Sequence, residues 1–347
     1  MHTVVVQWRE DAFGTSESPT LDAYSNLGEA LNREGDWYAA ERFLQQALRG
    51  QREIHGAEHP STLASMANLA STFWKQGRWK EAEELGMQAM ETSLKVLGQE
   101  HPDTLASMAN LASTYRNQGR WKEAEELGVQ VMKMRKRVLG QEHLSTLTSI
   151  ANLALTYKDQ GQWKEAEELE VQVIETRKRV LGQEHPDLLT SIGNLASTYM
   201  NQGQWKEAEE LGVQVMETAL RVLGQEHPDT LTSIGNLAST YMNQGRWKEA
   251  EELGVQVIET RKRVLGQEHP DTLISMNNLA HTFKHQGHDD RAIELMTCCM
   301  ELCVKVLGPS HHITQTILRT MTAWGIRCIT EEHRGQDNSC MPGAWVD

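Results

Sequence analysis

Apolar side chains recur along the chain with the spacing of an amphipathic helix. Between residues 102 and 118 they stand at successive intervals of three, three, one and three positions. These positions are Leu105, Met108, Leu111, Ala112 and Tyr115. Side chains at such intervals share one face of an α-helix. Because proline suits the first turn of a helix and glycine its end, Pro102 and Gly119 mark the limits of this predicted helix.

A second helix is predicted directly after that glycine. It opens at Trp121, with acidic residues in its first turns and the basic run 135–137 in its last. This order of charges complements the helix dipole. Leu139-Gly140 then ends the unit with a glycine at the C-cap. The pattern therefore predicts two antiparallel helices joined by a short turn.

The same helix pair returns at a fixed interval. Its closing Leu-Gly dipeptide recurs every 42 positions, at Leu97-Gly98, Leu139-Gly140, Leu181-Gly182, Leu223-Gly224, Leu265-Gly266 and Leu307-Gly308. By this register the pairs cover 18–54, 60–96, 102–138, 144–180, 186–222, 228–264 and 270–306. So strict a period indicates an array of structural repeats.

Stacking of the pairs follows, because no pair can bury its apolar stripe without a neighbour. The sequence predicts an all-α fold, a right-handed α-solenoid of about seven antiparallel helix pairs whose first helices line a concave surface. We expect a lead-in at 1–17, the seven pairs at 18–308, a capping helix at 309–334 and a disordered tail at 335–347. The tryptophans that open six second helices are expected to pack between repeats.

Composition narrows the class of protein. The formal net charge of −14 disfavours nucleic acid and anionic membranes as partners, because both attract basic surfaces. No apolar run is long enough for a membrane helix, and the first residues do not resemble a signal peptide. The five cysteines all lie in the last fifth of the chain, which fits reduced thiols. We expect a cytoplasmic protein.

The repeat closely resembles the tetratricopeptide repeats of the kinesin light chain family. The resemblance rests on LG, HP, NLA, Y, QG and EAE in the stretch LGQEHPDTLASMANLASTYRNQGRWKEAEEL, at the 42-residue period, and covers residues 20 to 308. It implies a non-enzymatic scaffold for protein–protein interaction that binds an extended peptide segment of a partner in its concave groove. A kinesin cargo adaptor is one alternative.

Another alternative comes from the opening MHTVVVQWRED, which looks like the segment that precedes the repeats in microbial nucleotide-dependent receptors of the NB-ARC or STAND type. Similar repeat arrays form the sensor regions of those receptors. The chain contains no phosphate-binding loop of the form GxxxxGK[ST]. The resemblance therefore implies a ligand-sensing repeat region detached from its nucleotide-binding domain.

One asparagine per repeat stands in the first helix, just before Leu-Ala or Leu-Gly. The seven are Asn26, Asn68, Asn110, Asn152, Asn194, Asn236 and Asn278. In the resembled family this position faces the groove and hydrogen-bonds the backbone of a bound peptide. A side-chain amide suits that role because it offers a donor and an acceptor. The alternative is that each amide satisfies a backbone group between repeats.

Two positions at the end of each first helix vary among otherwise similar repeats, and we expect them to project toward the groove. The groove residues predicted there are Trp74, Lys75, Arg116, Asn117, Lys158, Met200, Asn201, Met242, Asn243 and Lys284. Variation on a uniform frame is how a repeat scaffold selects a ligand, although drift at exposed sites is an alternative. Lys75, Arg116 and Lys158 would favour an acidic stretch of the peptide.

Other groupings predict no chemistry. The histidines that precede the first helices lie one repeat apart, too far for one metal ion, and are expected in loops or caps. Cys299 and Cys303 are expected as core filling, and the KEAEE acids as a solvated face paired with lysine. No nucleophile triad, glycine loop or HExxH helix occurs. We therefore predict no catalytic residues, no metal and no cofactor.

Overall fold

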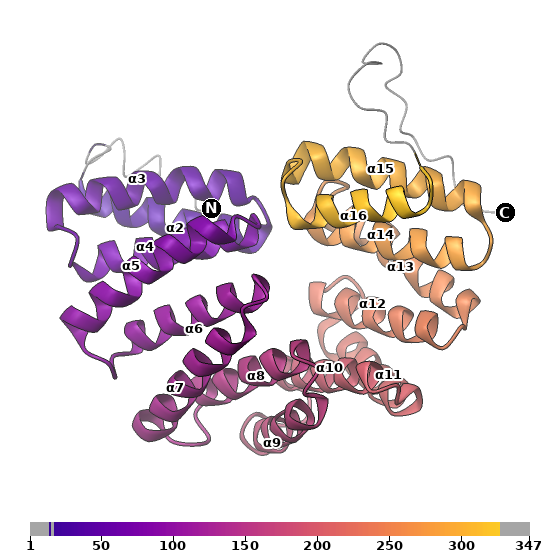
Figure 1. Cartoon of the computed structure of the whole chain (residues 1–347), viewed down its shortest axis with the longest axis horizontal. Helices are drawn as coiled ribbons and strands as arrows, with labels where there is room; N and C mark the ends of the chain where they lie inside the picture. The colour runs from indigo at the N-terminus through magenta and orange to yellow at the C-terminus, as the bar shows by residue number, and fades with distance from the viewer. Residues whose placement is uncertain (1–13, 15–16, 327–347) are drawn as a thin grey trace, which may run out of the picture. The chain divides into compact units, whose positions relative to one another are not determined.

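The chain folds into paired α-helices, shown by a computed structural model that describes residue 14 and residues 17–326 (Figure 1). All its regular elements there are helices. They are α2 (Ser18–Glu34), α3 (Trp37–His55), α4 (Pro60–Lys75), α5 (Trp79–Leu97), α6 (Pro102–Asn117), α7 (Trp121–Leu139), α8 (Leu144–Asp159), α9 (Trp163–Leu181), α10 (Pro186–Asn201), α11 (Trp205–Leu223), α12 (Pro228–Asn243), α13 (Trp247–Val264), α14 (Pro270–His285), α15 (Asp289–Leu307) and α16 (His312–Ala323). The predicted all-α repeat solenoid is confirmed.

The helices form two compact units that divide between Val222 and Leu223. The first unit holds α2 to α10 and all of α11 except its last residue, and the second holds α12 to α16. The lone helix α16 ends at Ala323, short of the range 309–334 expected for a capping helix. The expected tail at 335–347 and most of the expected lead-in at 1–17 lie outside the described residues.

A histidine caps the N-terminus of every first helix after α2, and of α16. The Nδ1 atom of each accepts a hydrogen bond from the backbone N–H two residues later, at 3.1 to 3.3 Å. The capping histidines are His59, His101, His143, His185, His227, His269 and His311. Each satisfies a backbone donor that the first turn of a helix leaves without a partner. The expectation of a loop or capping role is confirmed.

A left-handed glycine turns the chain between the two helices of a pair. Gly119 has φ +76°, a conformation that side-chain-bearing residues rarely adopt. It lets the Arg120 N–H return to the Tyr115 carbonyl oxygen at 2.9 Å, which satisfies the end of α6. The second helix begins at once, so the two helices must run antiparallel.

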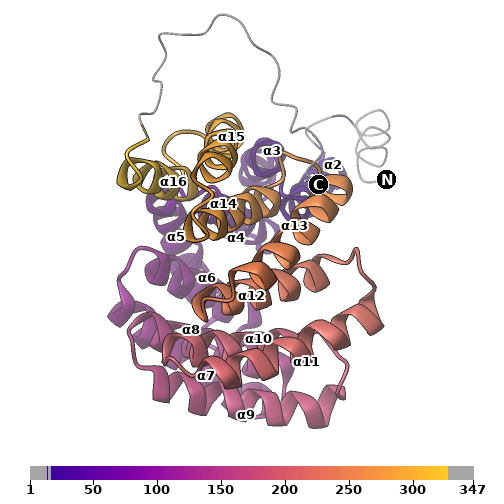
Figure 2. The same ribbon diagram turned by 90° about the vertical axis from the view of Figure 1, so that its right-hand side faces the viewer.

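Within each unit the first helices of the pairs lie on the inner side. In the first unit α2 contacts α4, α4 contacts α6, α6 contacts α8, and α8 contacts α10, as α12 contacts α14 in the second. Comparable contact between successive second helices does not occur among the described elements. Figures 1 and 2 show α7 and α9 outside α6, α8 and α10. The first helices therefore line the inner face of each unit.

Side-chain clamps join neighbouring repeats. Gln118 Nε2 donates to the Trp79 carbonyl oxygen at 3.2 Å and to Glu83 at 2.9 Å. The same clamp is made by Gln76, Gln160 and Gln202, while Gln286 makes only the tryptophan bond. The indole rings contribute less than expected to inter-repeat packing, because Trp121, Trp163 and Trp205 are 42%, 41% and 39% exposed.

The clamp also corrects the interpretation of the KEAEE acids. Glu83 is half-buried and binds both Gln118 and Arg120 of the next repeat. Burial opposes these bonds, yet the pKa of Glu83 lies below its ordinary value because Arg120 and Gln118 hydrogen-bond the carboxylate. One acid of the motif is thus an inter-repeat contact and not part of a solvated face.

Candidate functional site

The seven predicted asparagines lie on the first helices, five in the first unit and two in the second. Their side chains are exposed or half-buried. Within the described part of the chain, none of these amides makes a side-chain hydrogen bond to a backbone group; Asn278 Oδ1 accepts only a long bond from Asn277, at 3.4 Å. The inner face therefore carries a row of amides whose donors and acceptors remain available.

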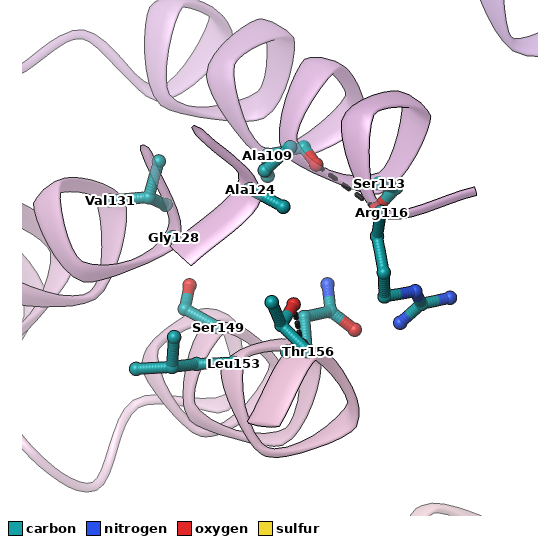
Figure 3. A pocket seen from close by; sticks show the side chains of 11 residues that line it. Ala109, Ser113, Arg116, Ala124, Gly128, Val131, Ser149, Leu153 and Thr156 are labelled. Carbon is teal, nitrogen blue, oxygen red and sulfur yellow. Dashed lines mark hydrogen bonds between the residues drawn. The ribbon is translucent and has the colours of Figure 1, made fainter. Parts of the chain in front are cut away.

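Cavities open beside these amides, between one helix pair and the first helix of the next pair. A cavity of about 240 Å³ is lined by Trp74, Gly86, Asn110, Arg116 and Asn152. A smaller one, of about 20 Å³, lies between α6, α7 and α8, whose residues face one another across it in Figure 3. In the second unit a cavity of about 190 Å³ is lined by Asn236, Met242, Gly254 and Asn278.

A glycine of the second helix lines each of the three cavities. These glycines are Gly86, Gly128 and Gly254. A methyl group added at Gly128 would lie 3.5 Å from Leu153 Cδ1, which is an ordinary van der Waals contact. The absence of a side chain at Gly128 therefore leaves open the space that the cavity occupies.

The predicted cations already have partners in neighbouring elements. Lys75 Nζ donates to the Asn32 carbonyl oxygen at 2.7 Å, and Lys158 Nζ donates to Ser197 Oγ at 3.3 Å. Lys284 Nζ lies 3.0 Å from Asp289 Oδ1. Burial, and secondarily the charge of Arg33, lowers the pKa of Lys75. Lys75 is therefore a poor candidate for contact with an acidic ligand.

Arg116 is better placed to meet a ligand. It lines both of these cavities in the first unit, and among the described residues its ion pair is with Asp159, at 3.5 Å from Nε. That Nε atom is buried and makes no hydrogen bond, as is also true of the indole Nε1 of Trp74 in the larger cavity. Burial lowers the pKa of Arg116, and Asp159 partly opposes this effect. Two buried donors that make no hydrogen bond thus border the same cavity.

The remaining predicted positions divide by exposure. Met200, Met242 and Asn117 are half-buried, whereas Asn201 and Asn243 are exposed. Asn243 Nδ2 donates to the Ser239 carbonyl oxygen at 2.9 Å. Trp74, Arg116, Asn110 and Asn152 lie around one cavity. Asn201 and Asn243 line none of the three cavities described.

Sequence reasoning missed Glu170. This carboxyl group stands in the fourth repeat at the position that Gly86, Gly128, Gly212 and Gly254 occupy in other repeats. It is 3% exposed, and neither carboxyl oxygen makes a hydrogen bond. The sequence alone shows the substitution, since four of the seven aligned repeats carry glycine there and only the fourth carries an acid. The sequence does not show that Glu170 is buried, because the other acids of the same helix are mostly exposed and suggest a solvated position.

Metal chemistry finds no support in the described residues, where no cluster of three or more histidine, cysteine or acidic side chains is placed to hold an ion. Cys299 and Cys303 are fully buried, and Cys299 Sγ donates to the Leu273 carbonyl oxygen at 3.2 Å. The two cysteines fill the core, as predicted. Of the helices described, none combines the length and apolar character needed to cross a membrane.

Stacked helix pairs with an inner face of available amides define an α-solenoid of the kind that binds other molecules along its length. A tetratricopeptide repeat model matches residues 19–95, 74–137 and 103–179, and a second tetratricopeptide repeat model matches 188–229, 230–271 and 272–313. The chain belongs to the tetratricopeptide repeat family, as the sequence predicted.

A comparison with solved structures gave several matches. One is the "putative kinesin light chain nearly identical TPR-like repeats" of Podosopora anserina, 40% identical over 59% of this chain and 98% of that one, with a TM-score of 0.49. NprR in complex with its cognate peptide NprX is 14% identical over 88% of each chain, with a TM-score of 0.57. Rap protein complexed with Competence and Sporulation Factor is 12% identical over 88% of this chain and 98% of that one, with a TM-score of 0.55. A comparison with curated proteins gave no match.

Proposed function

We propose that the protein is a non-enzymatic scaffold that binds an extended peptide segment of a partner protein along its first helices. The observation that carries this proposal is the row of asparagine amides, one per repeat, without backbone partners of their own. An amide pairs with a peptide N–H and C=O whatever the side chains of the peptide are. The row therefore supplies general affinity for a polypeptide backbone.

The spacing of the row suits an extended ligand. Neighbouring packed helices lie about 10 Å apart, and an extended chain rises about 3.3 Å per residue. A peptide lying across the first helices would then meet an asparagine at about every third residue. The cavities beside the amides would accept side chains that point into the protein and would give the scaffold its preference.

Two structures of similar fold support the proposal by what they bind. NprR is seen with its cognate peptide, and Rap protein with Competence and Sporulation Factor. An acidic side chain is a suitable ligand for Arg116, because the guanidinium and the Trp74 indole both offer unsatisfied donors to one cavity. Of the three cations that were expected to bind an acidic stretch of the peptide, we therefore retain Arg116 alone.

Removal of three adjacent amides tests the proposal. A random peptide library displayed on phage is selected against the full chain, and the affinity of the selected peptides is measured by fluorescence anisotropy. The triple variant Asn110→Ala, Asn152→Ala, Asn194→Ala should weaken binding at least about tenfold, since each lost hydrogen bond contributes about 0.5–1.5 kcal/mol. Circular dichroism should show unchanged helix content, because these side chains bind no backbone group.

A matched control sits on the second helices. Lys122, Lys164 and Lys206 follow the same period and are exposed, so their replacement by alanine should leave the affinity within about twofold. Peptides that bind the asparagine variant as tightly as the parent protein would refute binding along the first helices. Failure of the library to yield any binder would count against a peptide scaffold altogether.

The two alternatives from the sequence remain predictions. The receptor alternative rests on MHTVVVQWRED, which lies outside the described residues, and requires a phosphate-loop sequence in frame upstream in the gene. The kinesin adaptor alternative requires co-purification with a kinesin heavy chain from native cells.

A further inference from the structure

The fourth repeat differs from its neighbours at the floor of the inner face. Where α5, α7 and α13 carry the cavity-lining glycines, α9 carries Glu170. The counterpart residues in the end repeats are Leu44 and Met296, both fully buried. The end repeats thus fill the space with an apolar side chain, whereas the fourth repeat fills it with a carboxyl group.

The surroundings of Glu170 follow from the cavity one repeat earlier. Gly128 lies there with Arg116, Asn152 and Thr156 around it. Adding the period of 42 places Lys158, Asn194 and Thr198 around Glu170. Two of these counterparts also act on the carboxyl group, Thr198 through its hydroxyl as a hydrogen-bonding group and Lys158 through its charge. Glu170 therefore lies next to residues of the proposed binding surface, including one amide of the asparagine row.

No described residue forms an ion pair or a well-formed hydrogen bond with this carboxyl group, although the Thr198 hydroxyl beside it favours the ionised form. Both oxygens are buried without a hydrogen bond. Thr198 Oγ1 gives its one proton to the Asn194 carbonyl oxygen at 3.3 Å, and Lys158 Nζ donates to Ser197 Oγ. Within the described residues no ion pair joins Lys158 to Glu170. Burial raises the pKa of Glu170 to about 7, against the smaller opposing effects of Thr198 and Lys158.

An unsatisfied buried carboxyl group lacks a donor, and a cation satisfies it best. A basic partner also suits a chain with a formal net charge of −14. We infer that Glu170 is a specificity-determining residue that receives a lysine or arginine side chain of the bound peptide at the fourth repeat. This inference rests on the proposed function, and it adds a basic position to the acidic one proposed at Arg116.

Binding should therefore be coupled to a proton. A basic side chain pairs with the ionised carboxylate, so the protein must release the Glu170 proton when the peptide binds near or below neutral pH. Affinity for such a peptide should rise as the pH increases through about 7, the pKa of Glu170. The groups that face Glu170 are Lys158 from α8, Glu167 from α9 and Tyr199 from α10. Tyr199 stays neutral in that range because burial raises its pKa further.

The test selects a phage-displayed random peptide library against three full-length proteins. The parent protein should select peptides with lysine or arginine at one position of the consensus. Glu170→Gln keeps the shape of the side chain and removes its charge, so that preference should be lost. Affinity for a peptide selected on the parent protein should fall at least about tenfold, in line with the loss of a charge-assisted hydrogen bond.

The third protein moves the carboxyl group by one repeat. It combines Glu170→Gly with Gly128→Glu, and the chain offers this exchange because a Cβ atom at position 128 meets only an ordinary van der Waals contact. The basic residue in the consensus should then move by about three positions, the number of extended residues that span one repeat. Thermal melts followed by circular dichroism verify that each variant folds.

Each outcome decides between the proposals. An identical consensus from all three proteins, or an acidic preference that depends on Glu170, would overturn the inference while leaving peptide binding in place. A basic preference that moves with the carboxyl group would establish it. A library that yields no binder sensitive to the asparagine triple variant defeats the proposed function, and this inference falls with it.

Discussion

At the scale of single residues, Glu170 should make the stability of the free protein depend on pH. Its pKa rises from an ordinary 4.5 to about 7 on folding. Below pH 4.5 folded and unfolded chains both hold the proton, so there is no penalty. Between the two values only the unfolded chain releases it, and the free energy of unfolding falls by about 3 kcal/mol in total. Above pH 7 the loss is complete.

Glu170→Gln isolates this contribution, because glutamine does not titrate. Chemical denaturation of both proteins at pH values from 4 to 8 should show the parent losing stability relative to the variant mainly between about 4.5 and 7. A difference between the two proteins that stays constant over this range would mean that the carboxyl group is already satisfied in the folded state.

The sequence predicted which residues are candidates for the binding surface, but it did not predict their surroundings in the folded chain. The asparagine row was visible because its period matches the repeat. The hydrogen bond from Lys75 to the Asn32 carbonyl oxygen was not visible in the sequence, because it joins residues 43 positions apart on neighbouring first helices. The burial of Glu170 escaped for the same reason. Contacts between repeats decide which polar groups remain available, and a linear pattern does not contain them.

At the scale of the helix, the histidine caps lend themselves to a direct test. His143 Nδ1 accepts from the Ser145 N–H at 3.1 Å at the start of α8. His143→Ala removes this acceptor and should lower the free energy of unfolding by about 1 kcal/mol. His143→Asn supplies another acceptor and should recover most of the loss. Equal melting temperatures for the alanine and asparagine variants would show that the cap contributes nothing.

The helix ends were predictable because each has a local chemical cause. After α2, a histidine caps the start of each first helix, and a left-handed glycine follows its end; both act through the backbone within four or five residues. The role of Glu83 had a distant cause. Its hydrogen bonds to Gln118 and Arg120 come from the next repeat, so the KEAEE motif alone suggested a solvated face.

At the scale of the whole molecule, contacts between near neighbours should confine damage to a few repeats. Among the described helices, α8 makes its substantial contacts with α6, α7, α9 and α10. Leu147 is 1% exposed and belongs to the core cluster of Ile150 and Val173. Leu147→Ala should cost about 2–5 kcal/mol through the cavity that it leaves. In a repeat array that loss promotes local opening rather than uniform destabilisation.

Hydrogen exchange followed by mass spectrometry measures this confinement. Peptides from α7 to α9 should exchange faster in Leu147→Ala, while those from α14 keep the parent rate. Leu273→Ala, at an equally buried position of α14, is the matched control and should give the reverse result. The sequences of α8 and α14 differ, so their peptides are distinct in mass. Faster exchange along the whole chain in either variant would mean that the repeats unfold as one cooperative body, and the nearest-neighbour description would then be wrong.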